Sequence, residues 1–205
     1  MRVFGLTGGI ASGKSSAGQY LRSLGFTLID ADQLSRKVQE PGKPAYQALK
    51  ELWPECFGPD GVLNRKALAD IVFSNKFALG ILNGIVHPAV AEERDRQFQQ
   101  AEAAGESVLF YESALLTDSK GMDGLIVVLA DPETQLRRLM ARNSLTEAEA
   151  RDRMSAQVPR DLSLATHVIE NNGTEEELKR KVRQVADALI GLENPLSRSS
   201  AIVAG

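Results

Sequence analysis

The stretch GGIASGKS, residues 8–15, decides the fold that this sequence predicts. It satisfies the pattern G-x-x-x-x-G-K-[S/T] in full, and it lies between an apolar run at residues 3–7 and an amphipathic segment that starts at Ser15. The glycines allow a tight turn in which successive N–H groups converge on an anion, and the following helix adds the positive end of its dipole. The strand, turn and helix together predict a phosphate-binding loop.

Each position of this loop has a predicted role toward a nucleotide. Lys14 is expected to reach the β and γ phosphates of ATP, and the Ser15 hydroxyl is expected to bind Mg²⁺. A glycine turn that binds nothing is the alternative, but such a turn needs neither Lys14 nor a helix start in register. The predicted nucleotide-binding residues are Gly8, Gly9, Ile10, Ala11, Ser12, Gly13, Lys14, Ser15 and Ser16.

Outward from the loop, apolar runs alternate with amphipathic segments. Strands are expected at residues 3–7, 26–29, 107–111, 125–130 and 167–170, and runs rich in Val, Leu and Phe are typical of parallel strands covered on both faces. Strands that alternate with helices indicate an α/β fold with right-handed crossovers. The predicted fold class is therefore α/β, a P-loop NTPase fold with a five-stranded parallel sheet and helices on both faces.

A long helical block interrupts this alternation and is expected to be an inserted substrate-binding domain. Its last two helices are predicted at residues 77–86 and 89–104, separated by His87 and Pro88. Local signals mark several helix starts: Asn64 as a cap, and capping boxes at residues 146–149 and 174–177. The predicted division is a nucleotide-binding core at residues 1–32 and 107–192, the insertion at 33–106, a lid at 143–160 within the core, and a flexible tail at 193–205.

The composition of the chain limits which partners and functions are expected. The chain has 205 residues, 43% of them hydrophobic, one cysteine and two histidines, with a net charge of −3 of interspersed sign. No apolar run approaches the length of a membrane span, and no export signal is evident, which predicts a cytoplasmic protein. The absence of a broad basic field argues against nucleic acid as a partner. We expect no membrane or nucleic-acid partner, and a monomer or small homo-oligomer.

Two carboxylates follow the second predicted strand. Asp30 and Asp32 lie at the carboxyl edge of the sheet, where ligands of α/β folds bind, and in an extended segment both side chains would point to one side. Either residue is also suited to cap the helix expected at residues 33–40, and Asp30 to Gln33 has the spacing of a capping box. Asp32 is the stronger candidate for catalysis, whereas for Asp30 the cap is the stronger alternative.

A nucleotide site alone does not distinguish a GTPase, an ATPase and a kinase. The N-K-x-D element of guanine-specific GTPases is not satisfied by NKFA at residues 75–78, and a motor ATPase is normally larger. The size favours a small-molecule kinase. A nucleoside monophosphate kinase or another metabolite kinase, and a noncatalytic nucleotide-binding switch, remain as alternatives.

Seven strings in fixed order give a more specific indication. LTGGIASGKS, IDADQLSRKV, EPGKPAY, DGVLNRKALADIVF, LNGIVHP, ETQLRRLMARN and VIENNGT make residues 2–189 resemble the dephospho-CoA kinase family. The resemblance implies transfer of the γ-phosphate of ATP, with Mg²⁺, to the 3′-hydroxyl of the ribose of dephospho-CoA. The products would be coenzyme A and ADP.

The resemblance also implies roles for individual residues. It makes Asp32 the general base and Lys14 a catalytic phosphate ligand, and it adds Arg138 and Arg142 as catalytic cations on the helix that enters the lid. Solvated pairing of these arginines with Glu133 or Glu149 is the alternative. The implied substrate-binding residues are Asp32, Arg65, His87 and Leu115, and the implied adenine-side residues are Asn171, Asn172 and Gly173.

The sequence departs from the family pattern after the third predicted strand. The family usually has Pro-Leu-Leu followed two residues later by Glu, whereas this chain has Ala114 in place of the proline and Asp118 in place of the glutamate. Thr166 and His167 likewise stand where the family usually has Ala-Asp. The first departure lies on the side of the site where ribose and Mg²⁺ would be held.

Overall fold

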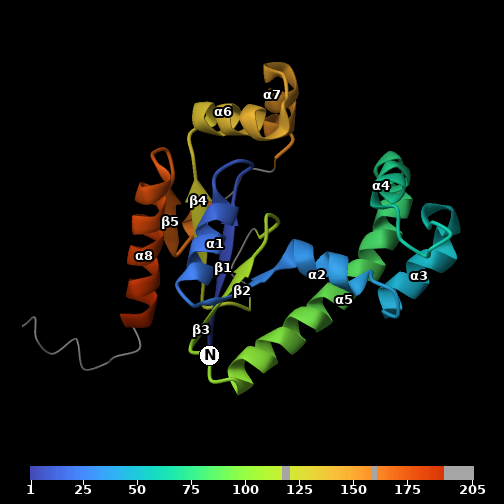
Figure 1. Cartoon of the computed structure of the whole chain (residues 1–205), viewed down its shortest axis with the longest axis horizontal. Coiled ribbons are helices and arrows are strands. Elements are labelled where there is room, and N and C mark those ends of the chain that lie inside the picture. The colour runs from blue at the N-terminus through green and yellow to red at the C-terminus, as the bar shows by residue number, and fades with distance from the viewer. Residues whose placement is uncertain (117–120, 158–160, 192–205) are drawn as a thin grey trace, which may run out of the picture. The chain divides into compact units, whose positions relative to one another are not determined.

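The computed structural model describes residues 1–116, 121–157 and 161–191, and Figure 1 shows how its elements follow one another along the chain. The strands are β1 Arg2–Gly8, β2 Thr27–Asp30, β3 Val108–Glu112, β4 Gly124–Leu129 and β5 His167–Glu170. The α-helices are α1 Lys14–Ser23, α2 Ala31–Val38, α3 Pro44–Leu52, α4 Arg65–Ser74, α5 Lys76–Ala103, α6 Pro132–Asn143, α7 Glu147–Ser155 and α8 Glu175–Gly191, and two short 3₁₀ turns are η1 Pro54–Cys56 and η2 Leu162–Leu164.

The five strands form one sheet in the order β2-β3-β1-β4-β5. The first strand, β1, lies in the middle and pairs in parallel with β3 and β4, and β4 pairs in parallel with β5. The register sets Leu6 opposite Glu112 and Gly8 opposite Val128. The loop that follows Gly8 therefore leaves the sheet at its centre, at the carboxyl ends of the strands, and the predicted five-stranded parallel α/β fold is confirmed.

Two compact units divide the chain. The first consists of Met1–Leu28 with Glu106–Gly205, and the second of Ile29–Gly105. In the first unit, one face of the sheet packs against α1 and α8, which contact each other and lie beside the strands in Figure 1. Its core is made of side chains that alternate along the strands and of the apolar stripes of both helices: Phe4, Leu6, Phe110, Ile126, Val128, Leu21, Leu178, Val182 and Leu189.

The second unit is helical and has its own apolar core. Residues from α3, α4 and α5 bury Leu49, Cys56, Val72 and Val86 together, with Trp53 beside them. Burial, followed by the nearby charge of Glu55, raises the pKa of the Cys56 thiol above its ordinary value. This cysteine is therefore a small apolar core residue, as single cysteines usually are in such cores.

One helix crosses the boundary that the sequence predicts at His87 and Pro88. The two helices expected at residues 77–86 and 89–104 are a single helix, α5, with Pro88 inside it. Proline removes one hydrogen bond to the carbonyl four residues earlier, which here belongs to Gly84. Gly84 and Pro88 are both exposed, so water can satisfy that carbonyl, while Val86 stays in the core. Packing of the apolar side thus outweighs the local break.

Helix starts agree with the capping residues read from the sequence. The Asn64 side chain accepts from the Ala67 N–H at 3.0 Å, and Thr146 and Glu149 form a reciprocal capping box. Thr174 and Glu177 exchange the same pair of hydrogen bonds at the start of α8. These predictions are confirmed because a cap involves only residues within one turn of each other.

Two predictions lie partly or wholly outside the described residues. These are the last residues of the predicted lid, 158–160, and the predicted tail, 193–205. Among the helices of the described ranges, none combines the length and the apolar character that crossing a membrane requires.

Candidate active site

The phosphate-binding loop joins β1 to α1, as its sequence predicts. Gly13 stands at the start of α1 with φ +94°, a left-handed conformation that favours glycine, and Ala11 has φ +54°. The Ser12 N–H donates to the Gly9 carbonyl at 3.2 Å, which closes the loop on itself. The first N–H groups of α1 have no partners within the helix, so they point out of its N-terminus toward the place where an anion would bind.

Lys14 and Ser15 meet a carboxylate that the sequence did not single out. The Lys14 ammonium forms an ion pair with the Glu112 carboxylate at 2.6 Å, and the Ser15 hydroxyl donates to the same oxygen at 3.2 Å. Glu112 is the last residue of β3. It is buried, and the residues before it in the strand are apolar. A carboxylate that ends an apolar strand at the carboxyl edge of a sheet is the signal that would have found it.

The helical hairpin of α6 and α7 reaches the tip of the loop. Ile10 and Ala11 pack against its small apolar cluster, which includes Leu136, Leu139 and Ala150. After α7, the Gln157 side-chain oxygen accepts from the Ile10 N–H at 2.6 Å. The segment predicted as a lid is thus attached to the phosphate-binding loop in the described structure.

The structure brings Arg138 to the turn between β5 and α8. Its guanidinium donates to the Asn171 carbonyl at 2.9 Å and to the Gly173 carbonyl at 3.3 Å. These hydrogen bonds differ from the alternative prediction, in which Arg138 pairs with Glu133 or Glu149. Arg142, one turn further along α6, is exposed and donates to the neighbouring Asn143 side chain at 3.0 Å.

The three adenine-side residues differ in their contacts. Asn171 is buried, and its side-chain amide donates to the Ser12 carbonyl at 2.8 Å. The Asn172 side chain accepts from the Asp131 N–H at 2.8 Å, which ties the turn to the start of α6. Gly173 provides the carbonyl that receives Arg138.

The turn after β3 carries the residues that depart from the family pattern. Leu115 is 83% exposed, and its N–H donates to the Ser113 hydroxyl at 3.1 Å. Ala114 is also exposed, and Asp118 lies outside the described residues. An exposed leucine beside the edge that carries Glu112 is available to an apolar group of a ligand.

In the second unit, the two carboxylates of residues 30 and 32 have different environments. The Asp30 side chain caps α2 by accepting from the Asp32 N–H at 2.8 Å and from the Gln33 N–H at 3.3 Å. The helix begins at Ala31, so the expectation that it starts at residue 33 with Asp32 as its cap is wrong. Asp30 is extended, as expected, at the end of β2, whereas Asp32 is helical and does not share its extended geometry. Asp32 lies in the first turn with an exposed side chain.

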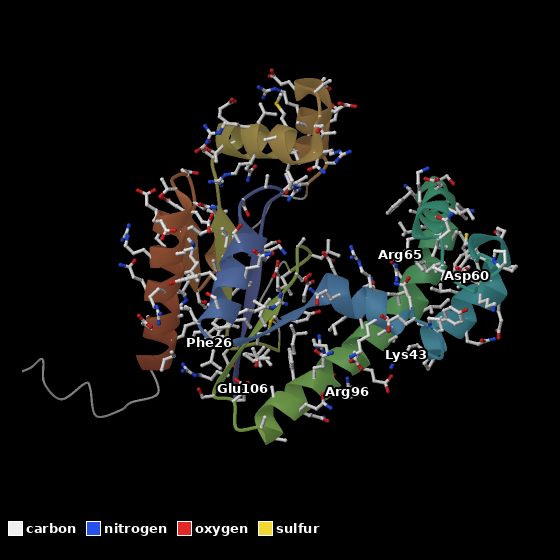
Figure 2. All side chains as sticks on the ribbon, in the orientation of Figure 1. Phe26, Lys43, Asp60, Arg65, Arg96 and Glu106 are labelled. Carbon is white, nitrogen blue, oxygen red and sulfur yellow. The ribbon has the colours of Figure 1, made fainter. Side chains whose placement is uncertain are left out.

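Arg65 begins α4 and reaches back to the end of α2, within the same unit. It donates to the Gln39 side chain at 2.8 Å and to the Arg36 carbonyl at 3.2 Å; Figure 2 labels it in this helical unit. Burial and then the positive charge of Arg36 lower the pKa of Arg65 from its ordinary value, against an opposite effect of Glu40. His87 lies on the exposed side of α5.

Fold and site together define the class of protein: an α/β P-loop protein with a bulky helical unit between its second and third strands, the architecture of a small-molecule phosphotransferase. The particular family follows from comparison with known proteins. Residues 2–177 match the family model described as dephospho-CoA kinase, and the chain belongs to the dephospho-CoA kinase family.

Individual relatives agree with this assignment. A dephospho-CoA kinase of Corynebacterium glutamicum is 44% identical over 191 residues, which cover 90% of this chain and 98% of that protein. The solved structure of TT1252 from Thermus thermophilus is 36% identical with a TM-score of 0.77, and the match covers 92% of this chain and 97% of that one. The dephospho-CoA kinase from Campylobacter jejuni is 27% identical, with a TM-score of 0.66 and the same coverage.

Proposed function

We propose that this protein transfers the γ-phosphate of ATP to the 3′-hydroxyl of the ribose of dephospho-CoA, giving coenzyme A and ADP. The observation that carries the proposal is the match of residues 2–177 to the family model. The formed phosphate-binding loop, with Lys14 and Ser15 at one carboxylate, supports it. We expect a cytoplasmic enzyme that is a monomer or a small homo-oligomer.

The proposed reaction exchanges one P–O bond for another. The 3′-hydroxyl oxygen attacks the γ-phosphorus, the bond from that phosphorus to the oxygen of ADP breaks, and the hydroxyl proton passes to the Asp32 carboxylate. Lys14 and Arg142 stabilise the charge on the transferred group. Asp30 is held as the cap of α2, which supports Asp32 as the residue of the pair that is free to act.

The residues around Ser15 fit a magnesium ion. Mg²⁺ prefers hard oxygen ligands and usually takes only one or two from the protein, with phosphates and water completing the octahedron. The Ser15 hydroxyl and the Glu112 carboxylate offer two such oxygens 3.2 Å apart. When bound, the ion would neutralise phosphate charge. Lys14 would then leave Glu112 for the phosphates.

In the described ranges, no cluster of three or more His, Cys, Asp or Glu side chains suited to a metal is found.

Arg65 supports a substrate site in the helical unit, the role proposed for residues 33–106. Burial, and then repulsion by the guanidinium of Arg36, lower the pKa of Arg65 from its ordinary value. An anion between them would relieve this repulsion, and the pyrophosphate of dephospho-CoA is such an anion. We assign His87 and Leu115 to the same substrate.

Asp32→Asn tests the base directly. Formation of coenzyme A from dephospho-CoA and Mg-ATP should fall by about 10²- to 10⁴-fold, the usual contribution of general-base catalysis, while ADP binding is retained. Asp70→Asn is the matched control, because Asp70 is an exposed aspartate of α4 paired with Lys66. Unchanged turnover in Asp32→Asn would remove Asp32 from the mechanism. A wild type that phosphorylates AMP or CMP but not dephospho-CoA would overturn the substrate assignment.

A further inference from the structure

The Asn171 side chain connects the far end of the sheet to the phosphate-binding loop. Asn171 is 5% exposed, and its Nδ2 donates to the Ser12 carbonyl at 2.8 Å across 159 positions of sequence. Its backbone N–H donates to the Leu129 carbonyl at 2.7 Å, so the residue is anchored to β4. The amide that reaches the loop is therefore attached to a rigid element.

Arg138 fixes which way this amide points. Its guanidinium lies at 2.9 Å from the Asn171 carbonyl and at 3.5 Å from Oδ1 of the same side chain. A cation on one side requires the amide oxygen there, and the Ser12 carbonyl on the other side requires the amide nitrogen. The orientation of the amide is thus determined by its partners on both sides.

This contact fixes the direction of a loop N–H group. The Ser12–Gly13 peptide is planar and trans, so its C=O and N–H point in opposite directions. With the Ser12 carbonyl held by Asn171, the Gly13 N–H is directed to the opposite side of the peptide. A Cβ on Gly13 would lie 2.1 Å from Asn171 Nδ2, which shows how closely the amide approaches the loop. Orienting such N–H groups in advance is what makes a loop an anion site.

We infer that Asn171 is a positioning residue for the phosphates of the nucleotide, oriented by Arg138, and that it does not act by contacting the adenine. The inference rests on the proposed function, since it refines how the same ATP site works. It changes the role expected for Asn171, whose side chain and backbone N–H are committed to the loop and the sheet. Arg138 connects helix α6 to the loop through Asn171.

Two probes separate phosphate positioning from base contact: inorganic tripolyphosphate, which has no base, and adenosine, which has no phosphate. In Asn171→Ala and Asn171→Ser, neither of which can reach the Ser12 carbonyl, the affinity for tripolyphosphate and for ADP should fall by about 10- to 100-fold, as expected for a lost buried hydrogen bond. The affinity for adenosine should stay within about 2-fold. Both variants add no charge, so electrostatic repulsion cannot produce the difference.

The matched control is Asn75→Ala. The Asn75 side chain likewise hydrogen-bonds to the backbone, accepting from the Phe77 and Ala78 N–H groups, but it caps α5 in the other unit. Its loss should therefore lower the unfolding temperature without changing the affinity for either probe. Equal losses for adenosine and ADP, or unchanged tripolyphosphate binding in folded Asn171 variants, would overturn the inference. A failure of the proposed function is a separate result: the wild type would bind ADP and tripolyphosphate but form no coenzyme A.

Discussion

The phosphate side and the substrate side of this protein are built differently. The phosphate-binding loop is held by contacts between residues far apart in sequence: Lys14 with Glu112, Ser12 with Asn171 and Ile10 with Gln157. In the helical unit, the groups assigned to the substrate are exposed, on helices with local caps at Asp30, Asn64 and Asn75. The phosphate site is preorganised within the core, whereas the substrate groups are left accessible.

Of the variants that test this comparison, Lys14→Met should have the largest effect, because it removes a cation of the preorganised phosphate site. Loss of a cation that stabilises the transferred phosphate should lower turnover by about 10³-fold, measured as coenzyme A formed from dephospho-CoA and Mg-ATP. The variant also leaves the buried Glu112 carboxylate unpaired, which is destabilising by itself.

The double variant Lys14→Met/Glu112→Gln isolates the effect on stability; since Glu112 is also a proposed magnesium ligand, its turnover is compared with that of Glu112→Gln alone. It removes the unpaired charge, so its unfolding temperature should lie above that of Lys14→Met, while turnover stays low. Recovery of turnover in the double variant would mean that Lys14 acts through stability rather than on the phosphates.

Arg65→Met tests whether the two sides act independently. It should raise the KM for dephospho-CoA by about 10- to 100-fold, because a charge-assisted hydrogen bond to the substrate is lost, and leave the KM for ATP unchanged. Lys66→Met is the control, since Lys66 is the adjacent cation and forms an exposed pair with Asp70. An equal change in both KM values would show that the sites are coupled, contrary to the comparison.

Glu93→Gln should have the smallest effect and concerns the stability of the helical unit. Glu93 on α5 accepts from Arg96 at 2.8 Å and pairs with Lys37 of α2 at 2.9 Å. Hydrogen bonds from Arg96, and then from Gln97 and Lys37, hold the pKa of this carboxyl well below its ordinary value despite its burial. The variant should lower the free energy of unfolding by roughly 1–3 kcal/mol at neutral pH.

The sign of the pH dependence follows from the direction of that shift. A carboxyl whose pKa is lower in the folded state stabilises the fold above its unfolded pKa of about 4.3, and this contribution is lost as the pH falls below that value. The difference in unfolding temperature between wild type and Glu93→Gln should therefore shrink on acidification. Glu92→Gln, an exposed neighbour, should show no such difference; a constant gap across pH would contradict the assignment.

The parts of the molecule that the sequence predicts well are those set by local interactions. The loop at residues 8–15 has its strand before it and its helix after it, and the caps at Asn64 and Thr146 involve only the next turn. Glu112 and the Ser12 contact of Asn171 were not predicted, because 98 and 159 residues separate the partners. The helix through Pro88 was missed because packing of Val86, not local propensity, decides it.

Two core residues that flank the inserted unit are joined by a hydrogen bond. The Thr27 hydroxyl donates to the Glu106 carboxylate at 2.6 Å, immediately before the chain enters the second unit and immediately after it returns. Joining ends that are already adjacent costs little conformational entropy, whatever the length of chain between them. The core is therefore suited to exchange: a different acceptor-binding module that supplies its own base in place of Asp32 can be grafted between these two positions, while the phosphate-binding loop with Lys14 and Glu112 remains unchanged.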